Sequence, residues 1–220
     1  MSTALRVLLY AVVGLPVIAI LWLTLAKIVR AVYKFPMPQF MANAIDNPLR
    51  RRIQPPAEMP IRHGIEPGMT VLEVGPGNGT YTMATACRVG DEGKVVAIDI
   101  ESKMIERVTR RAQAAGIKNV EARLADALDL PFEDGSFDAV FMIAVIGEIP
   151  TPEKAMKEFY RVLSPSGTLA FSELLPDPDY PRAKTLIRLA ASAGFRLKEK
   201  MGSVFAYTLV FEKGQGEPKT

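Results

Sequence analysis

Three glycines stand within five positions in the segment TVLEVGPGNGTY, residues 70–81. Gly75, Gly77 and Gly79 directly follow a short apolar, β-branched run that is typical of a strand, and a segment with helical spacing comes next. Glycine is the residue that most readily adopts positive φ and lets a ligand approach the backbone closely. In α/β sheets, ligands bind at the carboxyl ends of the strands. The segment therefore predicts a ligand-binding loop.

An acidic residue follows the glycines at a spacing that suits a nucleoside. Asp99 closes the next apolar run, twenty residues beyond Gly79, and a carboxylate there can accept hydrogen bonds from both ribose hydroxyls. Glu73 lies inside the preceding strand. A dinucleotide loop reads G-x-G-x-x-G and holds a pyrophosphate, which an anionic Glu73 would repel. The sequence G-P-G-N-G beside this carboxylate instead favours S-adenosylmethionine, whose sulfonium and ammonium groups are positive.

Apolar runs and amphipathic segments alternate along the rest of the chain. Strands that are apolar on both faces and alternate with helices predict a doubly wound, mostly parallel α/β sheet of the Rossmann-like kind. Two closing strands with no helix between them predict an antiparallel pair at one edge. We expect seven strands, at residues 70–74, 94–100, 120–126, 137–146, 167–175, 195–202 and 203–213, and helices at 80–89, 102–116, 151–163 and 180–194. Thr151 is expected to cap the third of these helices, with Pro152 at its first position.

Four segments together resemble the class I S-adenosylmethionine-dependent methyltransferases. They read VLEVGPGNG, VVAIDI, LADALDLPFEDGSFDAVFMI and EFYRVLSPSGTLAFSE. The resemblance covers most of residues 65–212, including the closing strand pair. It departs from the usual pattern at Pro76 and Asn78, and in SPSG where KPGG is frequent. The resemblance implies S-adenosylmethionine as cofactor and S-adenosylhomocysteine as product.

The same resemblance assigns roles to individual residues. It implies that Glu73 and residues 75–79 line the methionine part of the cofactor and that Asp99 holds the ribose. The adenine would pack on Ile100 and Met104, with Asp126 accepting its amino group. The residues implied to bind the cofactor are Glu73, Gly75, Pro76, Gly77, Asn78, Gly79, Asp99, Ile100, Met104, Asp126, Ala127 and Ile143. Two structural alternatives stay open: Met104 is at a core position of its helix, and Asp126 with Asp129 could cap a turn.

Methyl transfer is an in-line displacement that needs alignment of the reactants and exclusion of water. A general base is needed only where the acceptor loses a proton. Candidates near the expected carboxyl edge are Glu148, Glu173 and Tyr81. His63, just before the first strand, is a weaker candidate because it is expected in a surface loop.

The first part of the chain contains twenty uncharged residues, at positions 7–26. A helix of this length matches the hydrocarbon thickness of a bilayer, so we expect a single membrane-spanning anchor over residues 1–32. A cleaved signal peptide has a shorter apolar core, and a core helix would show a polar stripe. Basic residues follow the run, including Arg50, Arg51 and Arg52. Because basic residues flanking a membrane span stay on the cytoplasmic side, we expect the amino terminus outside the cell and the body in the cytoplasm.

The remaining boundaries follow from composition. Seven prolines between residues 33 and 68 predict a basic neck that packs on the body. The methyltransferase domain is expected at 69–212 and a flexible tail at 213–220. Because the basic excess is confined to the front of the chain, a nucleic-acid partner is not expected. One cysteine and one histidine also argue against a metal site, and Cys87 fits a small apolar helix position.

Few residues are left to form a specificity insertion over the carboxyl edge. We therefore expect the neck and the adjacent membrane to close the site, with a lipid or another hydrophobic small molecule as methyl acceptor. The acceptor atom and the oligomeric state stay open. The alternatives are a tethered methyltransferase of a soluble molecule or protein, an NAD-dependent oxidoreductase, and a module that binds without catalysis.

Overall fold

The computed structural model describes residues 10–14, 17–18, 21, 24–25, 47–175, 177 and 179–214. Contacts divide the chain into two units, Met1–Pro36 and Met37–Thr220. In the first unit, residues Tyr10–Gly14 form a π-helical turn. Most of the predicted anchor, the neck up to residue 46 and the tail from residue 215 lie outside the described residues. Within the described part of the chain, none of the helices has both the length and the apolar character needed to cross a bilayer.

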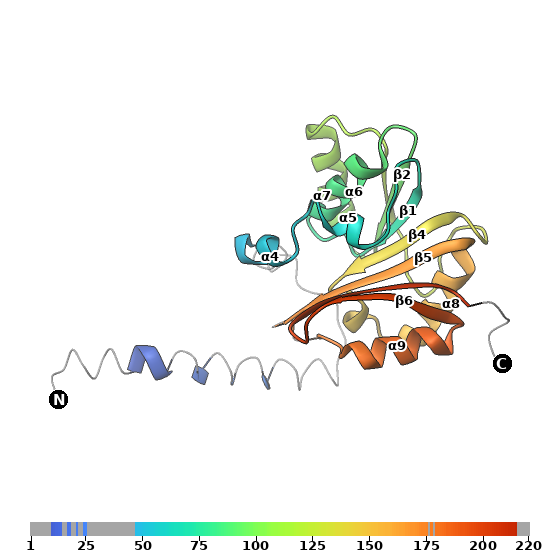
Figure 1. Ribbon diagram of the computed structural model, residues 1–220. Helices are drawn as coiled ribbons and strands as arrows, with labels where there is room; N and C mark the ends of the chain where they lie inside the picture. Colours follow the sequence, from blue (N-terminus) through green and yellow to red (C-terminus); the bar gives the residue numbers. More distant parts are fainter. Residues whose placement is uncertain are drawn as a thin grey trace. The chain divides into compact units, whose positions relative to one another are not determined.

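The second unit is built on a seven-stranded sheet with the strand order β3-β2-β1-β4-β5-β7-β6 (Figure 1). The first five strands pair in parallel, and β7 pairs antiparallel with both β5 and β6. The predicted α/β sheet with an antiparallel closing pair is therefore confirmed. The strands are β1 (Thr70–Val74), β2 (Lys94–Asp99), β3 (Val120–Leu124), β4 (Phe137–Ile143), β5 (Leu163–Leu174), β6 (Phe195–Gly202) and β7 (Ala206–Lys213).

Helices cover both faces of the sheet, α5 to α7 on one side and α8 and α9 on the other (Figure 1). The helices are α4 (Pro48–Ile53), α5 (Met59–Arg62), α6 (Thr80–Val89), α7 (Ser102–Ala114), α8 (Pro152–Val162) and α9 (Ala183–Ser192), with a 3-10 turn η2 (Ile146–Glu148) after β4. Helix α9 begins three residues later than expected: Pro181 disfavours the helical conformation at Tyr180, and Arg182 has an extended backbone. Thr151 precedes α8 as predicted, but its side chain makes no capping hydrogen bond.

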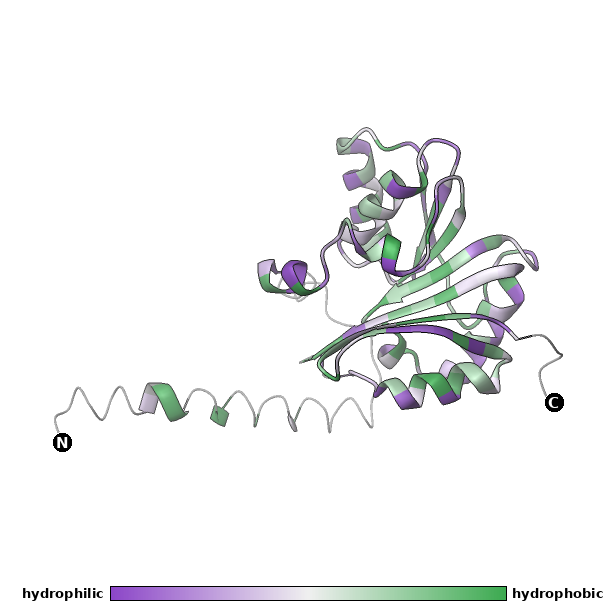
Figure 2. Cartoon of the chain, viewed as in Figure 1, coloured by the Kyte–Doolittle hydropathy of each residue, from purple (hydrophilic) through white to green (hydrophobic). Residues whose placement is uncertain are grey.

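The core lies on the two faces of the sheet. On one face, Phe159 of α8 and Leu186 of α9 pack against strand residues such as Phe171 and Phe211. On the other, Tyr81 and Val89 of α6 pack with residues of β1 and β4. Figure 2 shows the corresponding pattern, with apolar residues concentrated along the strands and hydrophilic ones on the outer helix surfaces. The two packed faces hold the carboxyl ends of β1, β2, β4 and β5 along one edge.

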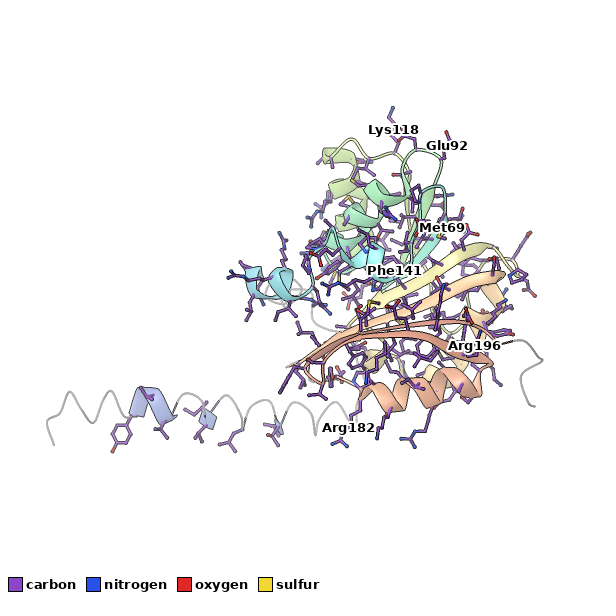
Figure 3. All side chains as sticks on the ribbon, viewed as in Figure 1. Met69, Glu92, Lys118, Phe141, Arg182 and Arg196 are labelled. Carbon is purple, nitrogen blue, oxygen red and sulfur yellow. The ribbon has the colours of Figure 1, made fainter. Side chains whose placement is uncertain are left out.

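His63 lies inside this core, so the expectation of a surface loop residue is wrong. Its Nε2 atom is 2.8 Å from Oγ of Ser172, and that hydroxyl is 2.8 Å from Oγ1 of Thr208. The ring also packs on Phe141, which is labelled at the centre of the body in Figure 3, with 5.1 Å between ring centroids. Burial, with a smaller effect from the Arg62 charge, lowers the pKa of His63 to about 3. The imidazole is therefore neutral at physiological pH and is a very weak base.

This burial predicts an acid-sensitive contribution to stability. The pKa of His63 is near 6.5 in the unfolded chain and about 3 in the folded one, so only the unfolded chain gains a proton between these values. The contribution is fully present above pH 6.5 and is lost as the pH falls. Between pH 7 and pH 5 the free energy of unfolding should fall by about 2 kcal/mol through this group.

The measurement is urea unfolding of the wild type and of His63→Gln at both pH values. Glutamine stays neutral and can still hydrogen-bond Ser172, so the wild type should lose more stability than the variant. An identical loss in both proteins would contradict the assignment.

Candidate active site at the carboxyl edge of the sheet

The glycine loop after β1 is a left-handed turn. Gly75, Gly77 and Gly79 have φ values of +67°, +55° and +81°. The Gly75 N–H donates to the carbonyl of Ile98 in β2, and the Gly79 N–H donates to the carbonyl of Pro76. Because L-residues rarely adopt these φ values, the loop needs glycine at all three positions.

Two of the glycines meet different surroundings. A Cβ at Gly75 would come within 2.6 Å of Cγ2 of Val145, so this glycine lets β1 pack against the loop that follows β4. A Cβ at Gly77 would have no heavy atom of the described residues within 4 Å. Gly77 therefore presents bare backbone to open space at the sheet edge, which is the kind of surface that a bound cofactor can cover.

Glu73 supplies a buried acid beside this loop. Its side chain is 3% exposed, and among the residues that the structure describes its Oε2 atom has no hydrogen-bond partner. Burial raises the pKa of Glu73 to about 8. A hydrogen bond with Thr82 opposes this rise only in part. A buried carboxyl oxygen without a partner is destabilising unless a ligand pairs with it. The open loop and this carboxyl group together fit a cofactor that carries positive charge.

The next predicted residues lie at the end of β2. Oδ1 of Asp99 accepts the Glu101 N–H at 2.9 Å, and burial raises the pKa of this acid to about 6, so it is mainly ionised at pH 7. Ile100 is 55% exposed, which is unusual for so apolar a side chain and leaves a surface for a flat aromatic ring. Met104 is buried in α7, in line with its alternative interpretation as a core residue.

The residues after β3 and β4 differ in their surroundings. Oδ1 of Asp126 accepts the Leu128 N–H at 2.9 Å, and Asp126 forms a bridge with Asp129, so this acid does cap a turn. Ala127 is buried beside it. Ile143 is the last residue of β4 and lies opposite Ser172 of β5 at the same sheet edge. The roles of these residues toward a cofactor stay predictions.

A polar network around Thr80 stabilises the loop, and the sequence did not reveal all its members. Oδ1 of Asn78 accepts from the Thr80 N–H and hydroxyl, at 3.2 and 2.9 Å. Arg111 of α7 donates to the Asn78 carbonyl and to the Thr80 hydroxyl, at 3.1 and 3.0 Å. Arg111 is one of several arginines in an amphipathic helix, and nothing in the pattern distinguishes it. Arg51 of α4 also reaches the Thr80 hydroxyl, at 3.4 Å.

Helix α4, in the predicted neck, is held at the same edge. The Tyr81 hydroxyl donates to the Gln54 carbonyl at 3.1 Å, and Arg50 lies over the Tyr81 ring. Arg50 itself is 9% exposed and its Nε atom donates to Oε1 of Gln54. Tyr81, a candidate base from the sequence, thus connects α4 to α6.

Several acids gather at the ends of β4 and β5. Glu173 is 1% exposed, and its Oε1 atom has no partner among the described residues. Burial and the charge of Asp177 raise the pKa of Glu173 well above its ordinary value, with Glu148 and Asp179 adding to the effect and Arg50 opposing it. Burial among these acids therefore favours the protonated form of Glu173. Glu148, in η2, is only half-buried.

The loop after β4 connects this acidic group to the glycine loop. Val145 contacts Gly75, and Gly147 approaches Asp179 so closely that a Cβ would lie 2.1 Å from the Asp179 carbonyl oxygen. Ala144, which begins the loop, has a φ of +57°, an unusual value for a residue other than glycine. Glu148 thus lies three residues after Val145, the residue of this loop that contacts Gly75 in the glycine loop.

Comparison with known proteins decides the family. Residues 65–204 match the family described as "Methyltransferase domain". The chain belongs to this family. It is 33% identical over 144 residues to the ubiquinone/menaquinone biosynthesis C-methyltransferase of Idiomarina loihiensis, an alignment that covers 65% of this chain and 56% of that protein. It is 37% identical over 102 residues to the demethylmenaquinone methyltransferase of Symbiobacterium thermophilum, covering 46% and 41%.

A solved structure of a methyltransferase has a similar fold. The S-adenosylmethionine-dependent methyltransferase of Aquifex aeolicus superposes with a TM-score of 0.75 at 26% identity, covering 80% of this chain and 98% of that one. The predicted methyltransferase domain and its S-adenosylmethionine cofactor are confirmed at the level of the family. The chain spans about half the length of the curated relatives that it matches.

Glu73 should couple cofactor binding to pH. The free protein holds Glu73 protonated below about pH 8, whereas a sulfonium and an ammonium favour the ionised form. The affinity for S-adenosylmethionine should therefore rise with pH between 6 and 8, by up to about tenfold per unit. Calorimetric titration with S-adenosylmethionine at several pH values between 6 and 8 measures this affinity.

The control for this coupling is Glu73→Gln. The variant should bind the cofactor more weakly at pH 8 and lose most of the pH dependence. Without cofactor, only the unfolded chain loses this proton between pH 4.5 and 8. The wild type should therefore lose stability relative to the unliganded variant as the pH rises through that interval. A wild-type pH slope retained in the variant would refute the role of this acid.

Alanine at the two glycines should separate packing from binding. Gly75→Ala combines positive φ with a clash on Val145 and should destabilise the fold by about 2 to 5 kcal/mol. Gly77→Ala should cost only about 1 to 2 kcal/mol. Its methyl group would occupy the open space, so cofactor affinity should fall at least tenfold in a folded protein. Urea unfolding measures the stability of both variants, and calorimetry measures their affinity for the cofactor. An undiminished affinity in Gly77→Ala would contradict the placement of the cofactor.

Proposed function

We propose that this chain methylates a ring carbon of a hydrophobic, quinol-type small molecule, with S-adenosylmethionine as methyl donor. The observation that carries the proposal is the buried acid Glu73 beside the open glycine turn, in a chain of the methyltransferase family. The acceptor class is supported by the relatives, whose names specify C-methylation in ubiquinone and menaquinone biosynthesis and methylation of demethylmenaquinone.

The chemistry of such an acceptor defines what the site must do. When bound, S-adenosylmethionine supplies an electrophilic methyl group and leaves as S-adenosylhomocysteine. A ring carbon becomes a good nucleophile when a neighbouring hydroxyl gives up its proton, and the carbon loses its own hydrogen after the new bond forms. The chain must therefore hold the ring in line, exclude water and accept protons.

Glu148 and Glu173 suit different parts of this task. Glu148 is half-buried at the sheet edge and can accept a proton from an acceptor hydroxyl. Burial among other acids favours the protonated form of Glu173, which can donate a hydrogen bond but is poorly suited to take up a proton. His63, with a pKa of about 3, and Tyr81, held by Gln54, are poorly suited as bases.

The membrane is proposed as the place of the reaction. The apolar run at residues 7–26 would anchor the chain with its amino terminus outside, and the basic residues after it would keep the body at the cytoplasmic face. An acceptor with a long apolar tail would then reach the sheet edge from the bilayer. A soluble acceptor, the alternative from the sequence, would need no such arrangement.

The proposed reaction can be tested on purified full-length protein in lipid nanodiscs. Deuterated-methyl S-adenosylmethionine is supplied with a demethylated quinol, with its oxidised quinone, or with no acceptor. The proposal predicts label on a ring carbon of the quinol and far less with the quinone, since only the reduced ring has ionisable hydroxyls. Label on an oxygen, or no transfer to any quinol by protein that binds the cofactor, would overturn it.

Glu148→Gln should lower kcat for this reaction by roughly 100-fold or more, because positioned proton transfer typically contributes that much. Cofactor affinity should be unchanged. Glu173→Gln is the matched control, since glutamine resembles the protonated acid, and its kcat should stay within about tenfold of the wild type. A larger effect in Glu173→Gln than in Glu148→Gln would exchange the two roles and contradict this assignment.

A further inference from the structure

The turn between β6 and β7 exposes two large apolar side chains. In the four residues from Ser203 to Ala206, Val204 is 73% exposed and Phe205 is 67% exposed. A hairpin turn gains nothing in its own stability from such residues, which polar or small residues would replace at no cost in packing. Their presence in water is therefore unexplained by the fold.

Hydrogen bonds hold this turn in place at the carboxyl edge. The Ser203 N–H donates to the Ala206 carbonyl, and the Leu175 N–H, just after β5, donates to the Phe205 carbonyl, both at 2.7 Å. The Tyr180 hydroxyl donates to the Val204 carbonyl at 2.5 Å. The two apolar side chains thus project from a braced turn beside the acidic group of the candidate active site.

Helix α4 carries a second exposed apolar pair at the same edge. Leu49 is 68% exposed and Ile53 is 40% exposed, although Arg50 between them is buried. The contacts of Arg51 and Gln54 with the start of α6 fix the helix beside the glycine loop. Figure 1 shows α4 and the β6–β7 turn projecting from the body on the same side, beyond the ends of β4 and β5.

Basic side chains are exposed on or next to the elements that carry the two apolar pairs. Arg52 is exposed on α4, Lys200 is exposed on β6 two residues before Gly202, and Arg182 is exposed at the start of α9. Figure 3 shows Arg182 at the end of α9 that lies nearer the β6–β7 turn. The acids nearby are Glu199, exposed next to Lys200, and Glu148, Asp177 and Asp179 at the ends of β4 and β5. Aliphatic and aromatic side chains with a basic rim are the pattern of surfaces that insert into an anionic lipid interface.

We propose that Val204, Phe205, Leu49 and Ile53, with the exposed cations Arg52, Arg182 and Lys200, form a docking surface for an anionic bilayer. The apolar side chains enter the headgroup region while the cations contact lipid phosphates. This seats the carboxyl edge of the sheet on the membrane, so an acceptor passes from lipid to the site without crossing water. The purpose of the surface rests on the proposed function, but its binding to lipid does not require catalysis.

The apolar area is divided into two small groups rather than one continuous patch. A folded protein partner needs a contiguous contact surface to form a stable interface. A bilayer interface accepts separate apolar protrusions, each surrounded by charge. The distribution therefore favours lipid over a second copy of the chain.

A probe on the turn tests this docking in the full-length chain. Because Cys87 is the only cysteine, Cys87→Ser with Phe205→Cys gives a single site for an environment-sensitive fluorophore. The matched control is Cys87→Ser with Lys118→Cys, at an exposed position just before β3 that Figure 3 shows far from the turn. Both proteins are bound to vesicles of phosphatidylcholine with or without phosphatidylglycerol.

With the anionic lipid, the probe at position 205 should shift to the blue and be at least fivefold less accessible to aqueous iodide than the probe at position 118. Charge removal by Arg52→Gln with Arg182→Gln and Lys200→Gln should abolish that difference. Equal quenching of the two probes on vesicle-bound protein would overturn the proposal. Protection at position 205 without vesicles would do so as well, because it would show that a second copy covers the turn.

Catalysis provides an independent measurement. Val204→Ser with Phe205→Ser should raise KM for a long-tailed quinol in vesicles at least tenfold and leave KM for a short-tailed, soluble quinol unchanged. Equal effects on both acceptors would contradict docking. If no quinol is methylated at all, the proposed function fails while the fluorescence result still decides the docking surface.

Discussion

The contact between Gly75 and Val145 is the constraint on which the rest of the site depends. Only a residue without a Cβ can take the left-handed conformation at the end of β1 and still let the loop after β4 pack against it. This contact joins the glycine loop to η2 and hence to Glu148. It also leaves Gly77 open at the edge of the sheet. The glycine loop and the loop after β4 are therefore packed against each other.

The site is built at the expense of stability. Glu73 and Glu173 each bury a carboxyl oxygen that lacks a partner among the described residues, and burial raises both pKa values. A chain optimised only for folding would place apolar residues there. For Glu73 a cationic ligand would remove this cost, since the charge that the interior disfavours would become a favourable contact in the complex. For Glu173 burial favours the neutral form, which can serve as a hydrogen-bond donor.

The sequence pattern predicts the strands of the sheet well, because each strand is marked by a short apolar run of its own residues. Runs such as residues 70–74 and 94–100 are apolar on both faces, and only a sheet covered on both sides uses them. The glycine loop could also be predicted, since a positive φ strongly favours glycine over other residue types. The burial of His63 and the contacts of Arg111 with the glycine loop could not be predicted, because each depends on contacts between distant parts of the chain. No spacing rule distinguishes a buried histidine from an exposed one.

The most direct test of the central claim, that this edge of the sheet holds S-adenosylmethionine, is calorimetric titration of the full-length protein in detergent. The ligands are S-adenosylmethionine, S-adenosylhomocysteine and NAD, each measured on the wild type and on Asp99→Asn. We predict selective binding of the two adenosyl compounds and a loss of affinity of at least tenfold in the variant, because the ribose hydroxyls lose a charged acceptor. Binding of NAD alone, or adenosyl binding that is unchanged in Asp99→Asn, would contradict the account.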